Sequence, residues 1–296
     1  MINLEILHMN KLIKVITILL VTFLITKISY AECLTDQKVK EIISGAPLTP
    51  ITGISADITL EDAYCSQKKY VNILKDLNGK PVGYKVGFTG KSTQERFKIL
   101  TPATAILFEH MFVKNGSSID RNFGHRALIE PDLMMIVKDS KIMNATNAIE
   151  ASKHISSIHP YIEMPALQIA KGEPITGAVI VAINMVATKM VMGPGILMQS
   201  NIEFIESLST METIFEDEMG TIIQKSPGST LMGNPMNVVL WLVEEFNRKG
   251  ITLKAGDRLS LGSVGKLFPL KEGNKTYTYS LNGISKIPAK VSIKVN

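Results

Sequence analysis

The chain after Pro81 is a succession of short apolar runs separated by glycine, proline and polar turns. Runs of this length favour β-strands, because an amphipathic helix needs a longer segment with a 3.6-residue period. The runs are GYKVGF, TAILF, RALIEPDLMMIV, YIEMPALQIA, GAVIVAI, TKMVMG, DRLSLG and IPAKVSIKV. The sequence therefore predicts a strand-rich domain over residues 81–296.

Helical patterns lie before this domain and near its end. Apolar residues recur near a 3.6-residue period in the first part, which predicts a small N-terminal helical cap over residues 32–80. Late in the chain, Asn234 and Pro235 signal the start of a helix, and Gly250 signals its end. A second helix is expected over residues 145–158. Because no internal repeat or low-complexity linker separates these parts, we expect them to pack as one α+β body.

The N-terminus has the pattern of a secretory signal peptide. Two lysines precede the apolar run 15–26, and the small residues Ser29 and Ala31 precede the expected cleavage point. The run is shorter than the ~20 residues needed to cross a bilayer, so a retained membrane anchor is the weaker alternative. We therefore expect residues 1–31 to be removed and the mature chain to be exported, periplasmic or secreted, with no stable membrane anchor.

The composition is that of an ordinary globular chain, with 45% hydrophobic and 20% charged residues. The formal net charge is +5, but the basic residues are scattered, which argues against nucleic-acid binding. The mature chain keeps two cysteines, Cys33 and Cys65. In an oxidising compartment they are expected either to form one disulfide or to remain as two buried or reduced thiols.

Glu130 and Asp132 are two positions apart in RALIEPDLMMIV, so their side chains point to the same face of a strand. Two neighbouring carboxylates repel each other, whereas Mg²⁺ or Mn²⁺ takes oxygen ligands and offsets that repulsion. The spacing alone is also typical of a solvated strand face. It therefore predicts a divalent-metal site only in combination with other evidence.

Ordered motifs from about residue 35 to 295 supply that evidence. The chain resembles the 2-keto-4-pentenoate hydratase branch of the fumarylacetoacetate hydrolase family, which also contains 4-oxalocrotonate decarboxylases. The resemblance implies a fumarylacetoacetate hydrolase-like mixed β-sheet (β-roll) domain of the catalytic type over residues 81–296. It also implies a divalent-metal site that chelates the 2-oxo acid end of a substrate. The motifs are GYKVGFT, AILFEHM, ALIEPD, MPALQI, MGNPMNVVLWLV, AGDRLSLGSVG and NGISKIPAKVSI.

The resemblance also implies a metal site and a catalytic residue at matching positions. GYKVG supplies a catalytic lysine near the metal, here Lys85, and the acid-x-acid pair supplies two metal ligands, here Glu130 and Asp132. The third ligand is the glutamate of PALE, and this sequence has Gln168 there, whose amide oxygen still coordinates Mg²⁺ but carries no charge. Glu163 lies an odd number of residues before Gln168, so we expect it on the opposite face unless the strand bends.

Further matching positions imply a substrate pocket. The V-A-D-N stretch of the family retains Asn184 as a substrate-binding residue, but Ile183 replaces its carboxylate. The turn with Gly262 and Ser263 is expected to offer backbone N–H groups and a hydroxyl to a substrate carboxylate, with a plain tight turn as the alternative. In the G-H-P motif that opens the late helix, Asn234 keeps the cap and loses an imidazole.

Two classes of function follow. The first is a hydratase, a hydro-lyase that depends on Mg²⁺ or Mn²⁺ and acts on a small 2-oxo or 2-hydroxy-dienoic acid, with a 2-oxo acid decarboxylase as a variant. The second is an exported small-acid-binding protein of the same fold without turnover. In the enzyme, Lys85 is expected to shuttle protons, and its pKa must fall before it can act as a base. In a metal-free site, Lys85 would instead pair with Glu130 or Asp132. Relatives commonly assemble, so a homo-oligomer is also expected.

Overall fold

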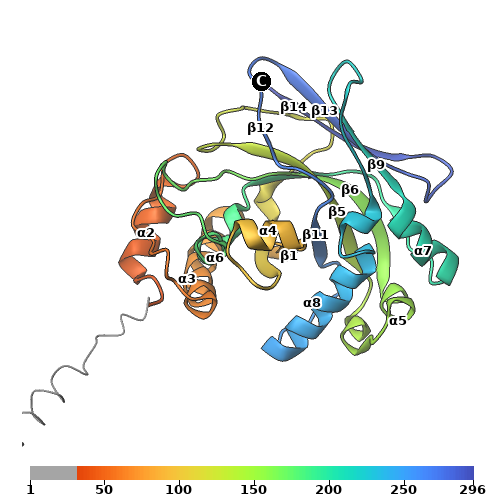
Figure 1. The fold of residues 1–296 in the computed structure, drawn as a ribbon, viewed down its shortest axis with the longest axis horizontal. Coiled ribbons are helices and arrows are strands. Elements are labelled where there is room, and N and C mark those ends of the chain that lie inside the picture. The colour runs from red at the N-terminus through yellow and green to blue at the C-terminus, as the bar shows by residue number, and fades with distance from the viewer. Residues whose placement is uncertain (1–31) are drawn as a thin grey trace, which may run out of the picture. The chain divides into compact units, whose positions relative to one another are not determined.

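A computed structural model describes residues 32–296, so the predicted signal peptide lies outside the described residues (Figure 1). Within that range, no helix is long and apolar enough to cross a membrane. Residues 32–296 form one compact unit of mixed sheets and helices, as the α+β prediction requires.

Two helices precede the first strand, in the part of the chain for which a helical cap was predicted. Helix α2 spans Asp36–Gly45 and helix α3 spans Leu60–Asn78. Each begins at a threonine, Thr35 or Thr59, whose side-chain oxygen accepts a hydrogen bond from a backbone N–H of the first turn. This capping compensates donors that have no partner inside the helix.

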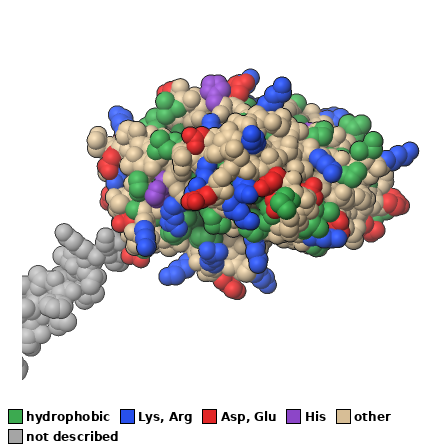
Figure 2. All heavy atoms as spheres, turned by 90° about the horizontal axis from the view of Figure 1, so that it is seen from above, with side chains coloured by type: hydrophobic (Ala, Val, Ile, Leu, Met, Phe, Trp, Pro, Cys, Tyr) green, Lys and Arg blue, Asp and Glu red, His purple; other side chains and the backbone are tan. Residues whose placement is uncertain are grey.

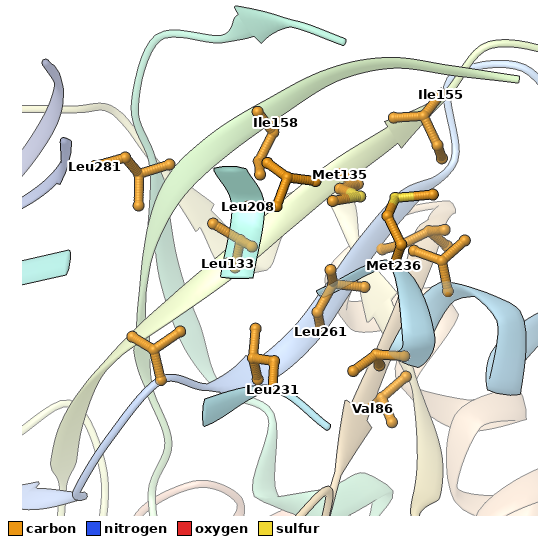
Figure 3. Close-up of a cluster of buried hydrophobic side chains, with 14 of the residues drawn as sticks. Val86, Leu133, Met135, Ile155, Ile158, Leu208, Leu231, Met236, Leu261 and Leu281 are labelled. Carbon is orange, nitrogen blue, oxygen red and sulfur yellow. The ribbon is translucent and has the colours of Figure 1, made fainter. Parts of the chain in front are cut away.

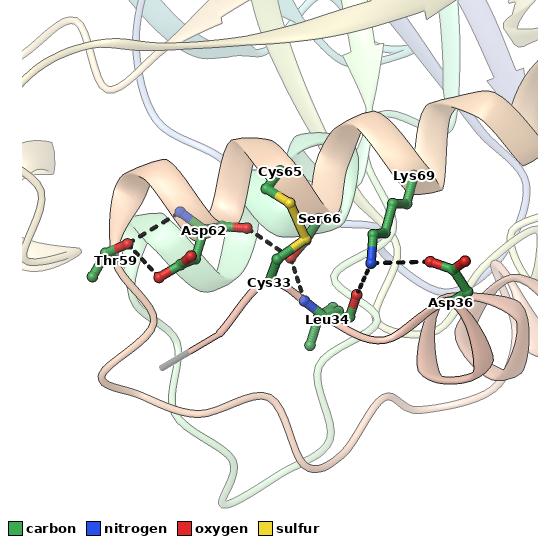
Figure 4. Close-up of a disulfide and its surroundings, with 8 residues drawn as sticks. All are labelled: Cys33, Leu34, Asp36, Thr59, Asp62, Cys65, Ser66 and Lys69. Carbon is green, nitrogen blue, oxygen red and sulfur yellow. Dashed lines mark hydrogen bonds and ion pairs between the residues drawn. A yellow bond between two sulfur atoms is a disulfide. The ribbon is translucent and has the colours of Figure 1, made fainter. Parts of the chain in front are cut away.

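A disulfide joins Cys33 to Cys65 and answers the question that the sequence left open (Figure 4). The backbone N–H of Leu34 donates to the Ser66 hydroxyl at 2.8 Å, and Lys69 Nζ donates to the Leu34 carbonyl at 2.9 Å. The first described residues are thereby fixed against the side of α3.

Two sheets make up the rest of the domain. The larger sheet has nine strands, and its central strands run in the order β2-β1-β11-β5-β6-β7. Its β1 and β11 are parallel, whereas β5 is antiparallel to both of its neighbours, β11 and β6. The nine strands are β1 Pro81–Gly87, β2 Ala103–Phe108, β3 Phe112–Val113, β5 Leu128–Val137, β6 Ile155–Met164, β7 Lys189–Met192, β8 Ile196–Leu197, β11 Arg258–Ser263 and β12 Phe268–Pro269.

The second sheet has five strands in the order β10-β9-β13-β14-β4. Strand β10 is at its edge and pairs only with β9. The strands are β4 Ser118–Ile119, β9 Glu212–Glu216, β10 Ile222–Pro227, β13 Lys275–Asn282 and β14 Ala289–Val295.

The remaining helices form two groups around the larger sheet (Figure 1). Helix α6 packs on α3, while α5, α7 and α8 contact one another. Helix α8 begins after Asn234, whose side chain caps it, and ends at the left-handed Gly250, as predicted. The helices are α4 Lys91–Arg96, α5 Ala148–Ser152, α6 Gly177–Ala182, α7 Ile202–Thr210 and α8 Pro235–Lys249.

The hydrophobic core lies between α7, α8 and the sheets (Figure 3). Val86, Leu133 and Leu261 come from neighbouring strands of the larger sheet and are fully buried. Met236 of α8 and Leu208 of α7 are buried in the same cluster. This apolar packing fixes the strands that carry the polar residues described below.

Two predicted elements are wrong. Only residues 148–152 of the expected helix 145–158 are helical, because the chain from Ile155 onward pairs with β5 as strand β6. The run GAVIVAI is helix α6 and not a strand. Four of its helical residues are buried apolar residues, so the segment has no polar face whose period would distinguish a helix from a strand.

Charged side chains of both signs are interspersed on the face of the molecule seen in Figure 2. This distribution agrees with the scattered charges in the sequence. Apolar side chains also occur there between the charged ones.

Candidate active site

Four neighbouring strands bring one lysine and three carboxylates together. Lys85 lies on β1, Glu130 and Asp132 lie on β5, and Glu163 lies on β6. Lys85, Asp132 and Glu163 are almost completely buried, with exposed fractions of 6%, 0% and 1%. Strand β11 separates β1 from β5 and contributes Ser260, which is paired with Lys85 in register. We call Lys85, Glu130, Asp132 and Glu163 the Lys85 cluster.

Direct contacts hold the Lys85 cluster together. Lys85 Nζ forms a buried ion pair with Glu163 Oε1 and is 3.4 Å from the carbonyl oxygen of Met185. The Ser260 hydroxyl donates to Asp132 Oδ2 at 2.8 Å. The cluster is therefore connected to β11 and to the segment that contains Met185.

Burial and mutual repulsion shift the titration of the carboxyl groups in this cluster. Burial, together with the charge of Glu163, raises the pKa of Glu130 to about 8 and that of Asp132 to about 7. Burial alone would lower the pKa of Lys85, but the surrounding charges of Glu163, Glu130 and Asp132 outweigh it and raise this pKa. For these side chains by themselves, the pKa of Lys85 is therefore raised and not lowered.

Strand β6, which carries Glu163, ends at Met164 and does not continue to Gln168, so the alternation that put these two residues on opposite faces does not apply. In the antiparallel pair of β5 and β6, Glu163 is directly opposite Glu130, so the two side chains share a face. The relevant geometry is the register between two strands, whereas the prediction compared Glu163 only with Gln168 along one strand.

Gln168 lies beyond the end of β6. Its backbone carbonyl accepts a hydrogen bond from the N–H of Ile51, which precedes α3. Its side chain is buried, and its Nε2 atom has no hydrogen-bond partner among the described residues. Within residues 32–296, it is Glu163, and not Gln168, that contacts Lys85 and completes the cluster.

The side chain of Asn184 binds the protein's own backbone. Its Oδ1 accepts from the N–H of Ile106 and its Nδ2 donates to the carbonyl of Ile106, both at 2.9 Å. This two-point contact fixes Asn184 to β2 and occupies the amide that was expected to bind substrate. The structure therefore assigns Asn184 a structural contact next to the site.

Asn184 opens a backbone segment that the sequence did not predict. Asn184, Met185 and Val186 have φ values of 55°, 49° and 53°, a left-handed conformation that costs energy in residues other than glycine. The contact of Asn184 with β2 holds this segment in place, and its Met185 carbonyl faces Lys85. Asparagine is among the residues that adopt a left-handed backbone, but N-M-V does not predict three such residues in a row, because valine strongly disfavours this conformation.

The turn at Gly262 and Ser263 lies beside the Lys85 cluster, and the N–H groups of the three residues after Ser263 are occupied. The N–H groups of Val264, Gly265 and Lys266 donate to Pro131 O, Ser263 Oγ and Gln224 Oε1 at 3.1, 3.2 and 2.8 Å. The Ser263 hydroxyl also lies near Glu130, where it acts to lower the pKa of that carboxyl. Those three N–H groups are therefore not available for a substrate carboxylate.

Comparisons with known proteins agree with this architecture. No model of a protein family matches the chain. The chain is 23% identical over 244 residues to a 2-keto-4-pentenoate hydratase of Paraburkholderia xenovorans, covering 82% of this chain and 88% of that protein. It is 23% identical over 247 residues to a 2-hydroxyhexa-2,4-dienoate hydratase of Comamonas testosteroni, covering 81% and 89%.

Among solved structures, the chain is similar to 4-oxalocrotonate decarboxylase from Pseudomonas putida G7 complexed with magnesium and adipate. The TM-score is 0.74 at 21% identity, and the match covers 90% of this chain and all of that one. A putative fumarylacetoacetate isomerase/hydrolase from Oleispira antarctica matches with a TM-score of 0.52 at 12% identity, over 74% and 95% of the two chains. The fold is fumarylacetoacetate hydrolase-like. The predicted fold class is thereby confirmed.

The fumarylacetoacetate hydrolase-like fold of this chain presents a donor set whose chemistry suits a divalent cation. Three carboxylates surround one ammonium, and the Oε2 atom of Glu163 is buried without a hydrogen-bond partner among the described residues. Carboxylate oxygens are the ligands that Mg²⁺ and Ca²⁺ prefer. As placed within residues 32–296, no three or more His, Cys, Asp or Glu side chains form a group that could hold a metal ion. Metal binding therefore requires these side chains to shift.

A cavity of about 330 Å³ lies at the start of β1 and β11. Its lining includes Lys80, Glu109, Asp257 and Arg258, and none of the Lys85 cluster. Glu109 therefore faces this cavity and does not contribute a carboxylate to the cluster.

Proposed function

We propose that this protein is a divalent-metal-dependent hydratase of the 2-keto-4-pentenoate hydratase type. Its substrate would be a small 2-oxo or 2-hydroxy-dienoic acid. The observation that carries the proposal is the Lys85 cluster, in which four adjacent strands bring three carboxylates around one lysine and bury Lys85, Asp132 and Glu163. The hydratases named above, similar over most of this chain, support the reaction class.

In this proposal, Glu130, Asp132 and Glu163 hold Mg²⁺ or Mn²⁺, with Glu163 in place of Gln168. The magnesium bound to the similar decarboxylase supports a divalent ion of this kind. When bound, such an ion supplies an electrophile for the oxygen atoms of a 2-oxo acid. The burial of Asp132 and Glu163 excludes water from two of the three ligands and strengthens their interaction with a cation.

Lys85 would hold the proton that the reaction transfers. Ketonisation of a dienol needs a proton donor near the carbon that receives the proton, and an ammonium group at Lys85 Nζ would supply it. The Met185 carbonyl and Glu163 orient this ammonium group. An ammonium group held at this position suits the role of the acid in the first proton transfer.

A decarboxylase is the second candidate, because the similar 4-oxalocrotonate decarboxylase shares the fold over its whole length. The structures of that decarboxylase hold magnesium with adipate and calcium with acetate, which supports a divalent ion and a small carboxylic acid in this proposal as well. A binding protein without turnover is the remaining alternative. The Lys85 cluster is compatible with all three, so the choice among them depends on measured turnover.

We also propose that residues 1–31 are a signal peptide and that the mature protein is exported. The disulfide between Cys33 and Cys65 supports this proposal, because disulfides persist in oxidising compartments. Mass spectrometry of the protein recovered from its native compartment should then find a mature chain that begins at Glu32. A chain that retains residues 1–31 would contradict the proposal.

The first experiment is a calorimetric titration of residues 32–296 with Mg²⁺ and Mn²⁺, with and without oxalate as a stand-in for a 2-oxo acid. Binding that tightens with oxalate is expected, and Glu163→Gln should weaken it at least as much as Gln168→Ala. Absence of metal binding at millimolar concentration would overturn the proposal.

Turnover then separates the three candidates. A hydratase consumes 2-hydroxypenta-2,4-dienoate, the dienol form of 2-keto-4-pentenoate, without releasing CO₂. A decarboxylase releases CO₂ from 4-oxalocrotonate. Binding of metal and oxalate without either reaction would identify a binding protein.

A further inference from the structure

The side chain of Gln224 connects the second sheet to the turn beside the Lys85 cluster. Gln224 lies on the edge strand β10 and is half-buried. Its Oε1 accepts from the N–H of Lys266 at 2.8 Å, and its Nε2 donates to the carbonyl of Val264 at 3.3 Å. In a parallel sheet, one residue likewise donates its N–H to a carbonyl of the neighbouring strand and accepts from an N–H of that strand. The Gln224 side-chain amide pairs with residues 264–266 as such a neighbouring strand would.

Gly265 allows this close approach. An added Cβ at Gly265 would lie 1.1 Å from Gln224 Nε2, so any larger residue there would displace the amide. Nothing comparable restrains this turn from the solvent side, where Gly265 and Lys266 are exposed. Gln224 is therefore the contact that fixes residues 264–266 to the second sheet.

The other side of the same turn contacts the residue between two proposed metal ligands. The Ser263 hydroxyl is 3.2 Å from the Pro131 carbonyl, and the N–H of Val264 donates to the same carbonyl at 3.1 Å. Pro131 lies between Glu130 and Asp132 in the chain, and Ser263 is opposite Asp132 in register. The turn thus lies between Gln224 and the carboxylates of β5.

We propose that Gln224 is a positioning residue for the Lys85 cluster. By holding residues 264–266, it keeps the Ser263 hydroxyl and the N–H of Val264 on the Pro131 carbonyl, and so fixes the backbone between Glu130 and Asp132. The inference rests on the proposed function, because it assumes that Glu130 holds a divalent ion. Interactions that orient metal ligands typically change metal affinity by about 10- to 100-fold when they are removed.

The experiment measures Mg²⁺ affinity in the presence of oxalate for the wild type and for Gln224→Ala. We expect a loss of about 10-fold, the lower end of that range, because Gln224 acts through Ser263 and not on a ligand directly. Ser226→Ala is the matched control, because it removes the third contact of the Gln224 side chain, from Nε2 to the Ser226 hydroxyl at 3.1 Å, and leaves both contacts to the turn. It should bind as the wild type does.

Two double variants test the route of the effect. Gly265→Ala should weaken binding in the wild type but cause no further loss in Gln224→Ala, where the amide is absent. Ser263→Ala should likewise remove the effect of Gln224→Ala, because the contact through which Gln224 acts is then missing. If the losses of Mg²⁺ binding free energy caused by the single variants are additive in both double variants, the substitutions weaken the fold in general, and the inference is overturned.

The outcomes separate this inference from the proposed function. If the wild type binds Mg²⁺ with oxalate and Gln224→Ala binds equally well, the role of Gln224 is refuted and the proposed function stands. If the wild type binds neither Mg²⁺ nor Mn²⁺, the proposed function and this role are refuted together. Amide hydrogen exchange at Val264–Lys266 shows in either case whether Gln224 fixes the turn.

Discussion

Removing the Cys33–Cys65 disulfide should destabilise the folded protein substantially. The bridge closes a loop with a sequence separation of 32 residues. In the chain-entropy treatment, opening a loop of this length lowers the free energy of unfolding by about 3.7 kcal/mol. At about 2–4 °C for each kcal/mol in a chain of roughly this size, the melting temperature should fall by about 7–15 °C.

The assay is thermal unfolding of residues 32–296 followed by circular dichroism, comparing the wild type with Cys33→Ser/Cys65→Ser. Ser66→Ala is the matched control, because it removes the hydrogen bond from Leu34 and leaves the disulfide intact. It should cost only about 1 kcal/mol. Dithiothreitol should lower the melting temperature of the wild type to that of the double variant and leave the double variant unchanged.

A particular result would refute this reasoning. If the double variant melts within about 1 °C of the wild type, the entropy of the closed loop does not limit global unfolding. Hydrogen exchange would then show the residues before α2 detaching while the sheets remain protected. The entropic argument applies only if those residues are ordered as part of the cooperative unit.

Three further predictions concern the Lys85 cluster. In urea unfolding, Lys85→Met should lower the free energy of unfolding by about 3–5 kcal/mol, because it leaves buried carboxylates unpaired. Adding Glu163→Gln to the same chain should restore part of this loss. Equal losses in the single and the double variant would contradict a direct ion pair between Lys85 and Glu163. The pKa values of Glu130 and Asp132 are raised in the folded protein, so their contribution to the stability of the metal-free fold is complete below their unfolded pKa values and is lost as the pH rises. Urea unfolding in EDTA should therefore show the free energy of unfolding falling from about pH 5 to pH 9, less steeply in Glu130→Gln. A flat profile would refute this prediction. Asn184→Gly keeps the left-handed backbone but loses both contacts to Ile106, so it should weaken Mg²⁺ binding in the presence of oxalate. Val186→Gly should relieve backbone strain and preserve this binding. If Val186→Gly weakened binding and Asn184→Gly did not, Asn184 would not position the segment.

Local sequence patterns determined much of the fold. The cap residue Asn234 and the left-handed Gly250 set the bounds of α8 because both act on backbone groups within one turn. The spacing of Glu130 and Asp132 placed both on one face of β5 because side chains alternate along a strand. These signals are local, so a single sequence contains them.

The ordered motifs added the fold that local patterns alone do not specify. They predicted the fumarylacetoacetate hydrolase-like arrangement and pointed to Lys85 beside Glu130 and Asp132, which the structure brings together. They also led to Gln168 as the third ligand, because P-A-L-Q matches the P-A-L-E motif, whereas the residue that contacts Lys85 is Glu163 on β6.

Only the tertiary structure decided the rest of the site. Glu163 joins the Lys85 cluster because the register of β5 against β6 puts it opposite Glu130. Asn184 binds Ile106, and Gln224 binds the turn after Ser263, across large separations in the chain. Contacts of this kind depend on how sheets pair and pack, and the energy that selects one register comes from burial over the whole domain. For this protein, therefore, the sequence determined which chemical groups are present and which strand faces they occupy, while the register of strands within the larger sheet and the packing of the two sheets decided which of those groups meet.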